Sequence, residues 1–213
     1  MKIALIGASG RVGSCVLNEA LSRGHQVTAI VRHPEGISKN NPGLTIVRGD
    51  VLKDKVEDLV QGYDAVISAY NPGLENPDIN NQRIEGARRI IAGVKKSGVK
   101  RLLVVGGAGS LEVSPGVQLI DTMKLPDQVM VGILATRDTL NLLRAEKNLE
   151  WTFLSPAASM ENGERTGHFR VGKDQLLKNE KGESKISFQD LAVAMVDELE
   201  HPQHVRERFT VAY

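Results

Sequence analysis

Residues 1–13 read MKIALIGASGRVG, a short apolar run followed at once by a glycine-rich turn. The run Ile3–Ile6 has the length and composition of a strand that is buried on both faces. The turn has the spacing GxxGxxG, and helical spacing of apolar residues starts at Val12. Glycines here allow a sharp turn, let a phosphate approach bare backbone, and bring the helix close to the strand. The stretch predicts a strand, a turn that binds the pyrophosphate of a dinucleotide, and a helix whose N-terminus faces that anion.

Strand-sized apolar runs and helical segments alternate along the rest of the chain. Segments with helical spacing include Val12 to Ala20 and Ile84 to Val94. Strands that alternate with helices predict a parallel sheet with helices on both faces and a ligand crevice where the strand order reverses. We expect one α/β domain over residues 1–213, a doubly wound parallel sheet or Rossmann fold. Further strands are predicted at Val27–Val31, Leu44–Val47, Ala65–Ile67, Leu102–Val105, Trp151–Leu154 and Phe209–Tyr213.

Two segments interrupt the alternation and are expected on the substrate side. Residues 111–130 contain two proline turns, which predict a long connection, either a binding loop or lid or an unstructured excursion. Residues 157–187 are rich in glycine and charge and are expected to form a small C-terminal annex with short strands, one of them at Lys185–Ser187. Ser187, with Asp190 three residues later, predicts the start of a helix.

The overall composition argues against a charged macromolecular partner. Lys and Arg total 27 and Asp and Glu total 26, so no excess charge favours nucleic acid or anionic lipid. The single cysteine, Cys15, excludes an intramolecular disulfide, and the first strand begins without a signal peptide ahead of it. The apolar runs are too short to span a bilayer. We expect a soluble, cytoplasmic protein, a monomer or homodimer, that binds small molecules and neither nucleic acid nor membrane.

The residues after the second and third predicted strands indicate which dinucleotide is preferred. NAD-specific sites place an acid at the end of the second strand, whereas an arginine accommodates the 2′-phosphate of NADP. Arg32 occupies this point, and Arg32 and Arg11 together could clamp the phosphate, although both could also be ordinary surface charges. Asp50 and Val51 follow the third strand and are expected at the adenine, although Asp50 is also a common turn or cap residue. We predict NADP(H) in preference to NAD(H).

Five motifs together resemble one family. They are GASGRVG (7–13), VR (31–32), GDV (49–51), VVGGAGS (104–110) and WTFLSP (151–156). Over nearly the whole chain they resemble the atypical short-chain dehydrogenase/reductases, in particular the NAD(P)H-binding NADH-flavin reductase type, similar to flavin/biliverdin reductase B and the NmrA-like regulators.

The resemblance implies a cofactor site at the ends of several strands. It places the phosphates at Gly7, Ser9, Gly10, Arg11 and Val12, with Gly13 completing the turn, and the 2′-phosphate at Arg32. It places the adenine at Asp50 and Val51 and the ribose side at Ala69 and Tyr70. The nicotinamide would lie beside Gly107, Ala108 and Ser110, and the far wall of the pocket would be formed by Ser155 and Pro156.

One departure from the wider family restricts the chemistry. Ordinary short-chain dehydrogenases use a Tyr-x-x-x-Lys pair to move the substrate proton, and none of the three tyrosines here is followed by such a lysine. Alcohol dehydrogenation is therefore not expected, whereas a flavin or quinone can take hydride at a conjugated ring and its proton from water. Ser110 could donate a hydrogen bond to that ring, or could bond nearby backbone instead. A non-catalytic NADP sensor is the alternative function, and an epimerase is a third.

The remaining reactive side chains are weaker candidates. The five histidines show no metal-ligand spacing, so no metal is expected. His168 is either a proton donor or an exposed loop residue, Cys15 is expected to be a small buried residue of the first helix, and Trp151 is expected in the core.

Overall fold

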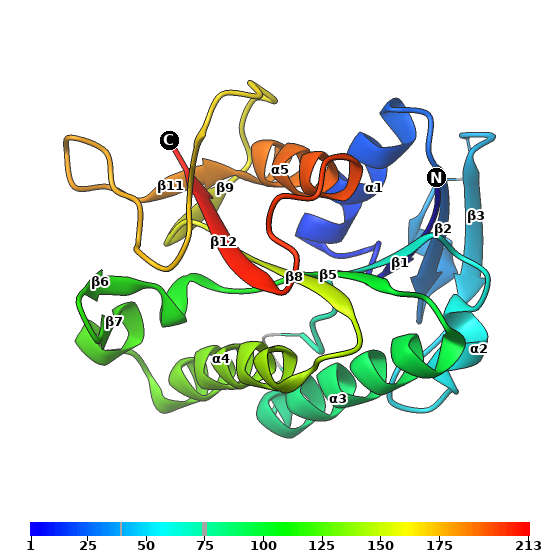
Figure 1. Ribbon diagram of the computed structural model, residues 1–213, viewed down its shortest axis with the longest axis horizontal. Coiled ribbons are helices and arrows are strands. Elements are labelled where there is room, and N and C mark those ends of the chain that lie inside the picture. Colours follow the sequence, from blue (N-terminus) through cyan, green and yellow to red (C-terminus); the bar gives the residue numbers. More distant parts are fainter. Residues whose placement is uncertain (39, 74–75) are drawn as a thin grey trace.

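An eight-stranded sheet forms the centre of the computed structural model, which describes residues 1–38, 40–73 and 76–213. The strand order is β10-β12-β8-β5-β4-β1-β2-β3 (Figure 1). Neighbouring strands are parallel except β10, which pairs antiparallel with β12. The strands are β1 (Lys2–Ile6), β2 (Gln26–Val31), β3 (Leu44–Arg48), β4 (Ala65–Ser68), β5 (Arg101–Val105), β8 (Glu150–Ser155), β10 (Arg170–Gly172) and β12 (Glu207–Ala212).

This order confirms the predicted doubly wound sheet. β1 pairs with β2 on one side and with β4 on the other, so the strand order reverses at β1. Gly7 directly follows β1, and the glycine-rich turn therefore lies at the switch point, where such sheets bind ligands.

Helices cover both faces of the sheet (Figure 1). α1 (Arg11–Ser22) and α5 (Phe188–Glu200) pack together on one face. α3 (Ile79–Ser97) and α4 (Asp127–Ala145) pack together on the other, with the short α2 (Val56–Val60) beside α3. α5 begins as predicted, because the Ser187 hydroxyl accepts a hydrogen bond from the Asp190 backbone N–H at 2.9 Å.

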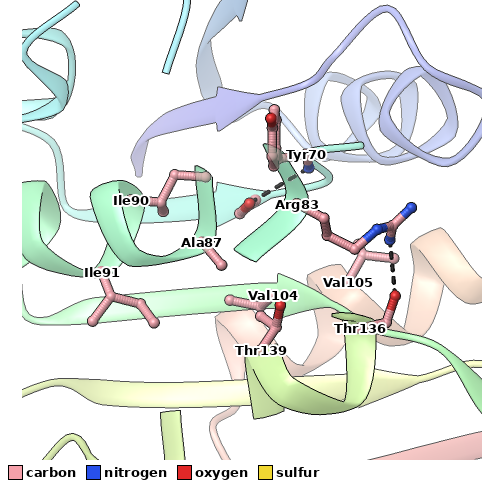
Figure 2. Close-up of a pocket in the computed structure, with 10 residues that line it drawn as sticks. Tyr70, Arg83, Ala87, Ile90, Ile91, Val104, Val105, Thr136 and Thr139 are labelled. Carbon is pink, nitrogen blue, oxygen red and sulfur yellow. Dashed lines mark hydrogen bonds between the residues drawn. The ribbon is translucent and has the colours of Figure 1, made fainter. Parts of the chain in front are cut away.

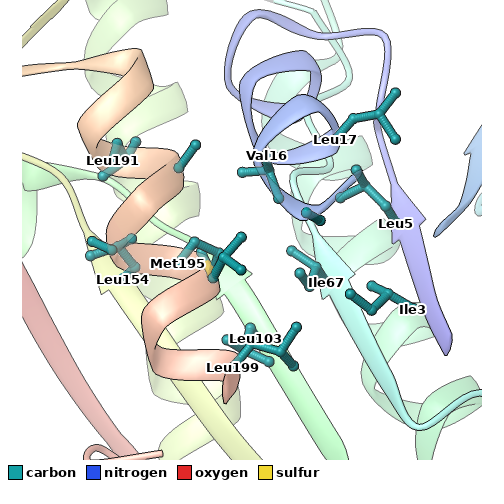
Figure 3. Close-up of a cluster of buried hydrophobic side chains, with 14 of the residues drawn as sticks. Ile3, Leu5, Val16, Leu17, Ile67, Leu103, Leu154, Leu191, Met195 and Leu199 are labelled. Atoms are coloured by element: carbon teal, nitrogen blue, oxygen red, sulfur yellow. The ribbon is translucent and has the colours of Figure 1, made fainter. Parts of the chain in front are cut away.

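The strands are apolar throughout because each face of the sheet is buried under helices. Ile3 and Leu5 of β1 belong to the cluster under α1 and α5, whereas Ala4 and Ile6 belong to the cluster under α3 and α4. Figure 3 shows the first cluster, in which Met195 and its neighbours on α5 face the strands alongside α1. This two-sided burial explains why the sequence shows continuous apolar runs rather than alternation.

The segment 111–130 is more ordered than a structureless connection. It contains a two-stranded ribbon, β6 (Glu112–Ser114) with β7 (Val117–Gln118), and a 3₁₀ turn over Leu119–Thr122. α4 then begins at Asp127, inside the predicted connection. The turn with Pro115 therefore connects β6 to β7, and the turn with Pro126 connects the 3₁₀ turn to α4.

The segment 157–187 contains short strands, as predicted. β9 (Ser159–Glu161) pairs in parallel with β11 (Lys185–Ser187). This segment is tied to the preceding one, because the Glu112 backbone N–H donates to the Asp174 carbonyl at 2.8 Å. The Asp174 carboxylate in turn accepts a bond from Arg208 Nε at 2.9 Å, and Arg208 is a buried residue of β12. Residues 111–130 and 157–187 are thus both linked to β12.

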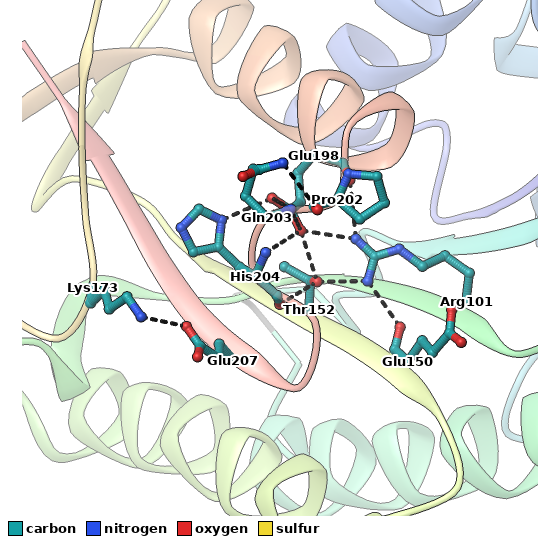
Figure 4. Close-up of polar contacts among 9 residues, drawn as sticks. All are labelled: Arg101, Glu150, Thr152, Lys173, Glu198, Pro202, Gln203, His204 and Glu207. Carbon is teal, nitrogen blue, oxygen red and sulfur yellow. Dashed lines mark hydrogen bonds and ion pairs between the residues drawn. The ribbon is translucent and has the colours of Figure 1, made fainter.

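A buried ionic cluster lies near the amino end of the interior strand β5, between the sheet and α5 (Figure 4). Arg101 begins β5, and its Nη2 lies 3.0 Å from Glu198 Oε1 of α5. Both residues are buried, with exposed surface fractions of 6% for Arg101 and 4% for Glu198. His204 Nδ1 lies 2.8 Å from the same carboxylate. None of the helices within the described residues is long and apolar enough to cross a bilayer.

Candidate functional site: a crevice at the switch point

A cavity of about 190 Å³ lies beyond the carboxyl ends of β1, β2 and β4. It brings together most of the cofactor residues predicted from the N-terminal third of the chain. Its lining comprises Ile6, Gly7, Ser9, Gly10, Ile30, Val31, Arg32, Gly49, Asp50, Val51, Ala69, Tyr70 and Asn71.

The three glycines of the turn have different roles. Gly7 has φ +82°, and a Cβ there would lie 2.6 Å from the Ala69 carbonyl oxygen. A Cβ on Gly13 would lie 2.1 Å from the Gly7 carbonyl oxygen, so Gly13 allows α1 to approach β1. A Cβ on Gly10 would be 3.4 Å from that oxygen, an ordinary contact, and Gly10 lines the cavity. Gly7 and Gly13 are therefore needed by the backbone, whereas Gly10 leaves room for a ligand.

The N-terminus of α1 lies uncapped beside the first cavity. Gly10 is its N-cap, and among the described residues no side chain bonds to this cap and no acid lies in the first turn. The backbone N–H groups of the first turn carry partial positive charge. Val12 packs against the core and Gly13 is buried, so both can contribute only through these N–H groups, whereas the Arg11 side chain is exposed.

A second cavity, of about 340 Å³, adjoins the first and shares Arg32, Gly49 and Asp50 with it. Its other lining residues are His33, Arg48, Lys53 and Asp54. Arg48 was not among the predicted site residues, and the structure places it as the last residue of β3. The register pairs Val31 with Arg48, which brings the two arginines to adjacent strand ends. A basic residue at the end of each of two neighbouring parallel strands was the signal that could have identified it.

Asp50 lies beside both cavities and also acts as a turn residue. It lines both cavities, and its Oδ1 accepts a hydrogen bond from the Leu52 backbone N–H at 3.0 Å. The Asp54 carboxylate accepts a bond from the Asp50 backbone N–H at 2.7 Å. Both carboxylates are thus engaged by their own loop.

Tyr70 is held in place by helix α3. Its hydroxyl donates to the Gln82 carbonyl at 3.0 Å, and its ring occupies the space that a Cβ on Gly86 would need, 2.2 Å from a ring carbon. Burial raises the pKa of Tyr70 to about 12. The hydroxyl is thus bonded to a backbone carbonyl, and burial disfavours the phenolate that a proton-shuttling tyrosine needs.

The residues predicted for the acceptor side lie at the ends of β5 and β8. Gly107 follows β5, and a Cβ on it would lie 3.2 Å from Thr136 Cγ2 of α4. Ser110 is buried, and its hydroxyl and carbonyl oxygens each accept a bond of 2.9 Å from Arg208 Nη1. Ser155 and Pro156 are buried at the end of β8. Among the described residues that line the two cavities, none comes from these two strand ends.

The remaining candidates from the sequence, Trp151, His168 and Cys15, lie outside the lining of the two cavities. Trp151 lies in the core, 3% exposed, and His168 is exposed. Burial raises the pKa of Cys15, which disfavours a reactive thiolate. The described residues contain no cluster of three or more His, Cys, Asp or Glu side chains suited to a metal ion.

Comparisons with known proteins show which family this chain resembles. The sequence model of a family described as NAD(P)H-binding matches residues 7–202. The uncharacterised Bacillus subtilis protein YwnB is 42% identical over 99% of this chain and 98% of its own length. A solved structure of a candidate epimerase from Bacteroides thetaiotaomicron is 50% identical with a TM-score of 0.93, covering 100% of this chain and 96% of that one. A candidate NADH-flavin reductase from Streptococcus pneumoniae is 37% identical with a TM-score of 0.86, covering 100% and 99%.

Proposed function

The chain belongs to the NAD(P)H-binding family, and from this premise we propose that it is a reductase that uses NADPH to reduce a conjugated acceptor such as a flavin or a quinone. The observation that carries the choice of NADPH is the second cavity. Arg32, Arg48 and Lys53 line it, next to the crevice that contains the glycine-rich turn. The resemblance to a candidate NADH-flavin reductase supports the acceptor class.

The described residues of the two cavities would hold the adenosine and pyrophosphate of such a dinucleotide. The pyrophosphate would lie at Gly10 and the uncapped N-terminus of α1, where bare backbone and free N–H groups meet. The adenosine would extend toward Asp50 and Val51, and its 2′-phosphate would enter the second cavity. Guanidinium groups bind phosphate in a bidentate fork, so Arg32 and Arg48 are suited to discriminate NADP from NAD.

Replacing Arg32 by alanine tests this cofactor preference. We expect the Kd for NADPH to rise about 10- to 100-fold, because one charge-assisted contact to the 2′-phosphate is lost, while the Kd for NADH barely changes. Arg48→Ala should act in the same direction. Titration of protein fluorescence with each dinucleotide measures both constants, and Lys55→Ala is the control because Lys55 is exposed and lines neither cavity. Equal losses for NADPH and NADH would contradict the assignment.

The absence of a proton relay determines the kind of acceptor. The Tyr-x-x-x-Lys pair is missing from the sequence, and Tyr70, with its raised pKa, does not replace it. NADPH supplies a hydride when bound. The residues of this chain would position a planar ring beside Gly107 and Ser110 and would leave the proton to water. Flavins and quinones meet this requirement as hydride acceptors, whereas simple ketones do not; secondary alcohols, which donate hydride to NADP⁺, would need the missing relay in the reverse reaction.

A comparison of acceptors, with Ser110→Ala as the variant, tests the chemistry. We expect steady-state NADPH oxidation with FMN, riboflavin or a naphthoquinone to exceed both NADPH oxidation with simple ketones and NADP⁺ reduction with secondary alcohols. Ser110→Ala should lower kcat about 2- to 12-fold, the range expected for one neutral hydrogen bond, and should leave the Kd for NADPH unchanged. Faster turnover of secondary alcohols than of every flavin and quinone tried would refute the reductase.

A non-catalytic NADP sensor is the second candidate. It is favoured by the Ser110 hydroxyl, which already accepts a bond from the buried Arg208, and by the missing proton relay. Tight NADPH binding without turnover of any acceptor would select the sensor. The epimerase described for the Bacteroides relative would need a catalytic base, and Tyr70 with its raised pKa does not provide one.

A further inference from the structure

Arg83 of α3 holds a partly buried positive charge between neutral partners (Figure 2). Its Nη1 donates to Thr136 Oγ1 at 2.9 Å, and its Nη2 donates to Asn71 Oδ1 at 3.0 Å. Its Nε is buried and has no hydrogen-bond partner in the described part of the chain. Within residues 1–38, 40–73 and 76–213, no carboxylate forms an ion pair with Arg83.

The surroundings of Arg83 increase the cost of its charge. The small cavity next to it, about 30 Å³, is lined mostly by apolar side chains such as Ala87, Ile90 and Val104 (Figure 2). This burial lowers the pKa of Arg83, although an arginine stays charged at neutral pH. Among the described residues this cation has lost water and gained only neutral acceptors, which do not restore its desolvation energy as a bound anion would.

Arg83 lies where the dinucleotide crevice meets the predicted acceptor side. Asn71, which accepts one of its bonds, lines the crevice. Thr136, which accepts the other, lies against Gly107 at the end of β5. Its two hydrogen bonds therefore link the crevice at the switch point to Gly107, one of the residues predicted to flank the nicotinamide and the acceptor.

We propose that Arg83 binds a negatively charged group of the acceptor, so that the protein prefers conjugated rings carrying a sulfonate, carboxylate or phosphate over neutral ones. This inference rests on the reductase proposed above and makes its substrate class narrower. Thr136 and Asn71 fix the plane of the guanidinium in advance, which reduces the ordering cost when the anion binds.

The test compares two quinones that differ in charge. Menadione is the neutral acceptor, 1,4-naphthoquinone-2-sulfonate is the anionic one, and Arg83→Gln is the variant. We expect kcat/KM for the sulfonate to fall about 10- to 100-fold and that for menadione to change less than about threefold. The ratio of variant to parent is taken within each acceptor, so their different reduction potentials cancel. Arg88→Gln is the matched control, because Arg88 is exposed on the same helix and the change removes the same charge.

A binding measurement separates this inference from the proposed function. Calorimetric titration of the sulfonate into the NADP⁺-loaded protein should show binding that Arg83→Gln weakens by the same factor and Arg88→Gln does not. If no acceptor is turned over, the reductase fails, and the titration still decides whether Arg83 binds the anion. Equal losses for both quinones, or a matching loss of NADPH affinity in Arg83→Gln, would overturn the proposal, because Arg83 would then serve the fold or the dinucleotide.

Discussion

Gly10→Val is expected to abolish NADPH binding while the protein stays folded. Gly10 has φ −75° and ψ 167°, which valine adopts readily, and its Cβ would meet only the Gly7 carbonyl, at 3.4 Å. The two methyl groups would then occupy the cavity at the N-terminus of α1, where the pyrophosphate must reach bare backbone. The loss should exceed about 100-fold in Kd, because several backbone hydrogen bonds to phosphate are prevented together.

The measurement is a dinucleotide titration combined with thermal unfolding. Gly36→Val is the control, since Gly36 has no heavy atom within 4 Å of its Cβ position and lies outside the crevice. Gly13→Ala, unlike Gly10→Val, should lower the Tm, because its Cβ would lie 2.1 Å from the Gly7 carbonyl oxygen. Unchanged NADPH affinity in Gly10→Val would remove the assignment of the crevice as a cofactor site.

Glu198→Gln is expected to cost about 3–5 kcal/mol of unfolding free energy, the range found when one partner of a buried ion pair is neutralised. Arg101 would keep its charge in a site where 6% of the residue is exposed. The amide would also lose a bond from the backbone N–H of Gln203 or His204, which the carboxylate accepts (Figure 4). Urea unfolding measures the change. The exposed pair Lys173–Glu207 provides the control, and Glu207→Gln should leave the denaturation midpoint almost unchanged.

The pH dependence of the same difference is a further check. Burial acts to raise the pKa of Glu198, but hydrogen bonds from His204 and nearby backbone N–H groups outweigh it and hold the pKa below its ordinary value. A lowered folded-state pKa stabilises the protein above the unfolded value, about 4.3, and this contribution is lost as the pH falls through the folded value. The gap between parent and Glu198→Gln should therefore be full near neutral pH and shrink in acid. A gap that stays constant down to pH 3 would be inconsistent with this account.

The sheet and the crevice could be predicted because local sequence determines both. Each run of Val, Ile and Leu is buried on two faces, so the strands were recognisable without knowledge of their neighbours, and β1 and β2 end where expected. The Ser187 cap and the contact of Gly13 with Gly7 are made within a few residues. Gly7 is in addition restricted by the distant Ala69 carbonyl, although its position after the first strand was recognisable from the sequence.

Other parts of the site depend on contacts between distant residues. The position of Arg48 beside Arg32 follows from the β2–β3 register, and that of Arg83 from the packing of α3 on α4. A helix periodicity assigns residues to a face and does not indicate which neighbour that face meets. The bond from Arg208 to Ser110 joins residues 98 positions apart, so neither side chain could be assigned its partner in advance.

The contact between Arg208 and Ser110 also has a consequence for protein synthesis, because Arg208 is made long after the residues of the crevice. Every residue that lines the dinucleotide crevice is present once residue 71 has been made. Ser110 and Asp174, in contrast, are held by Arg208 of the last strand. Because the chain is synthesised from its N-terminus, the nascent chain holds all its crevice residues long before Arg208 can hold the residues predicted for the acceptor side. We expect nascent chains arrested before β12 to lack an assembled acceptor side.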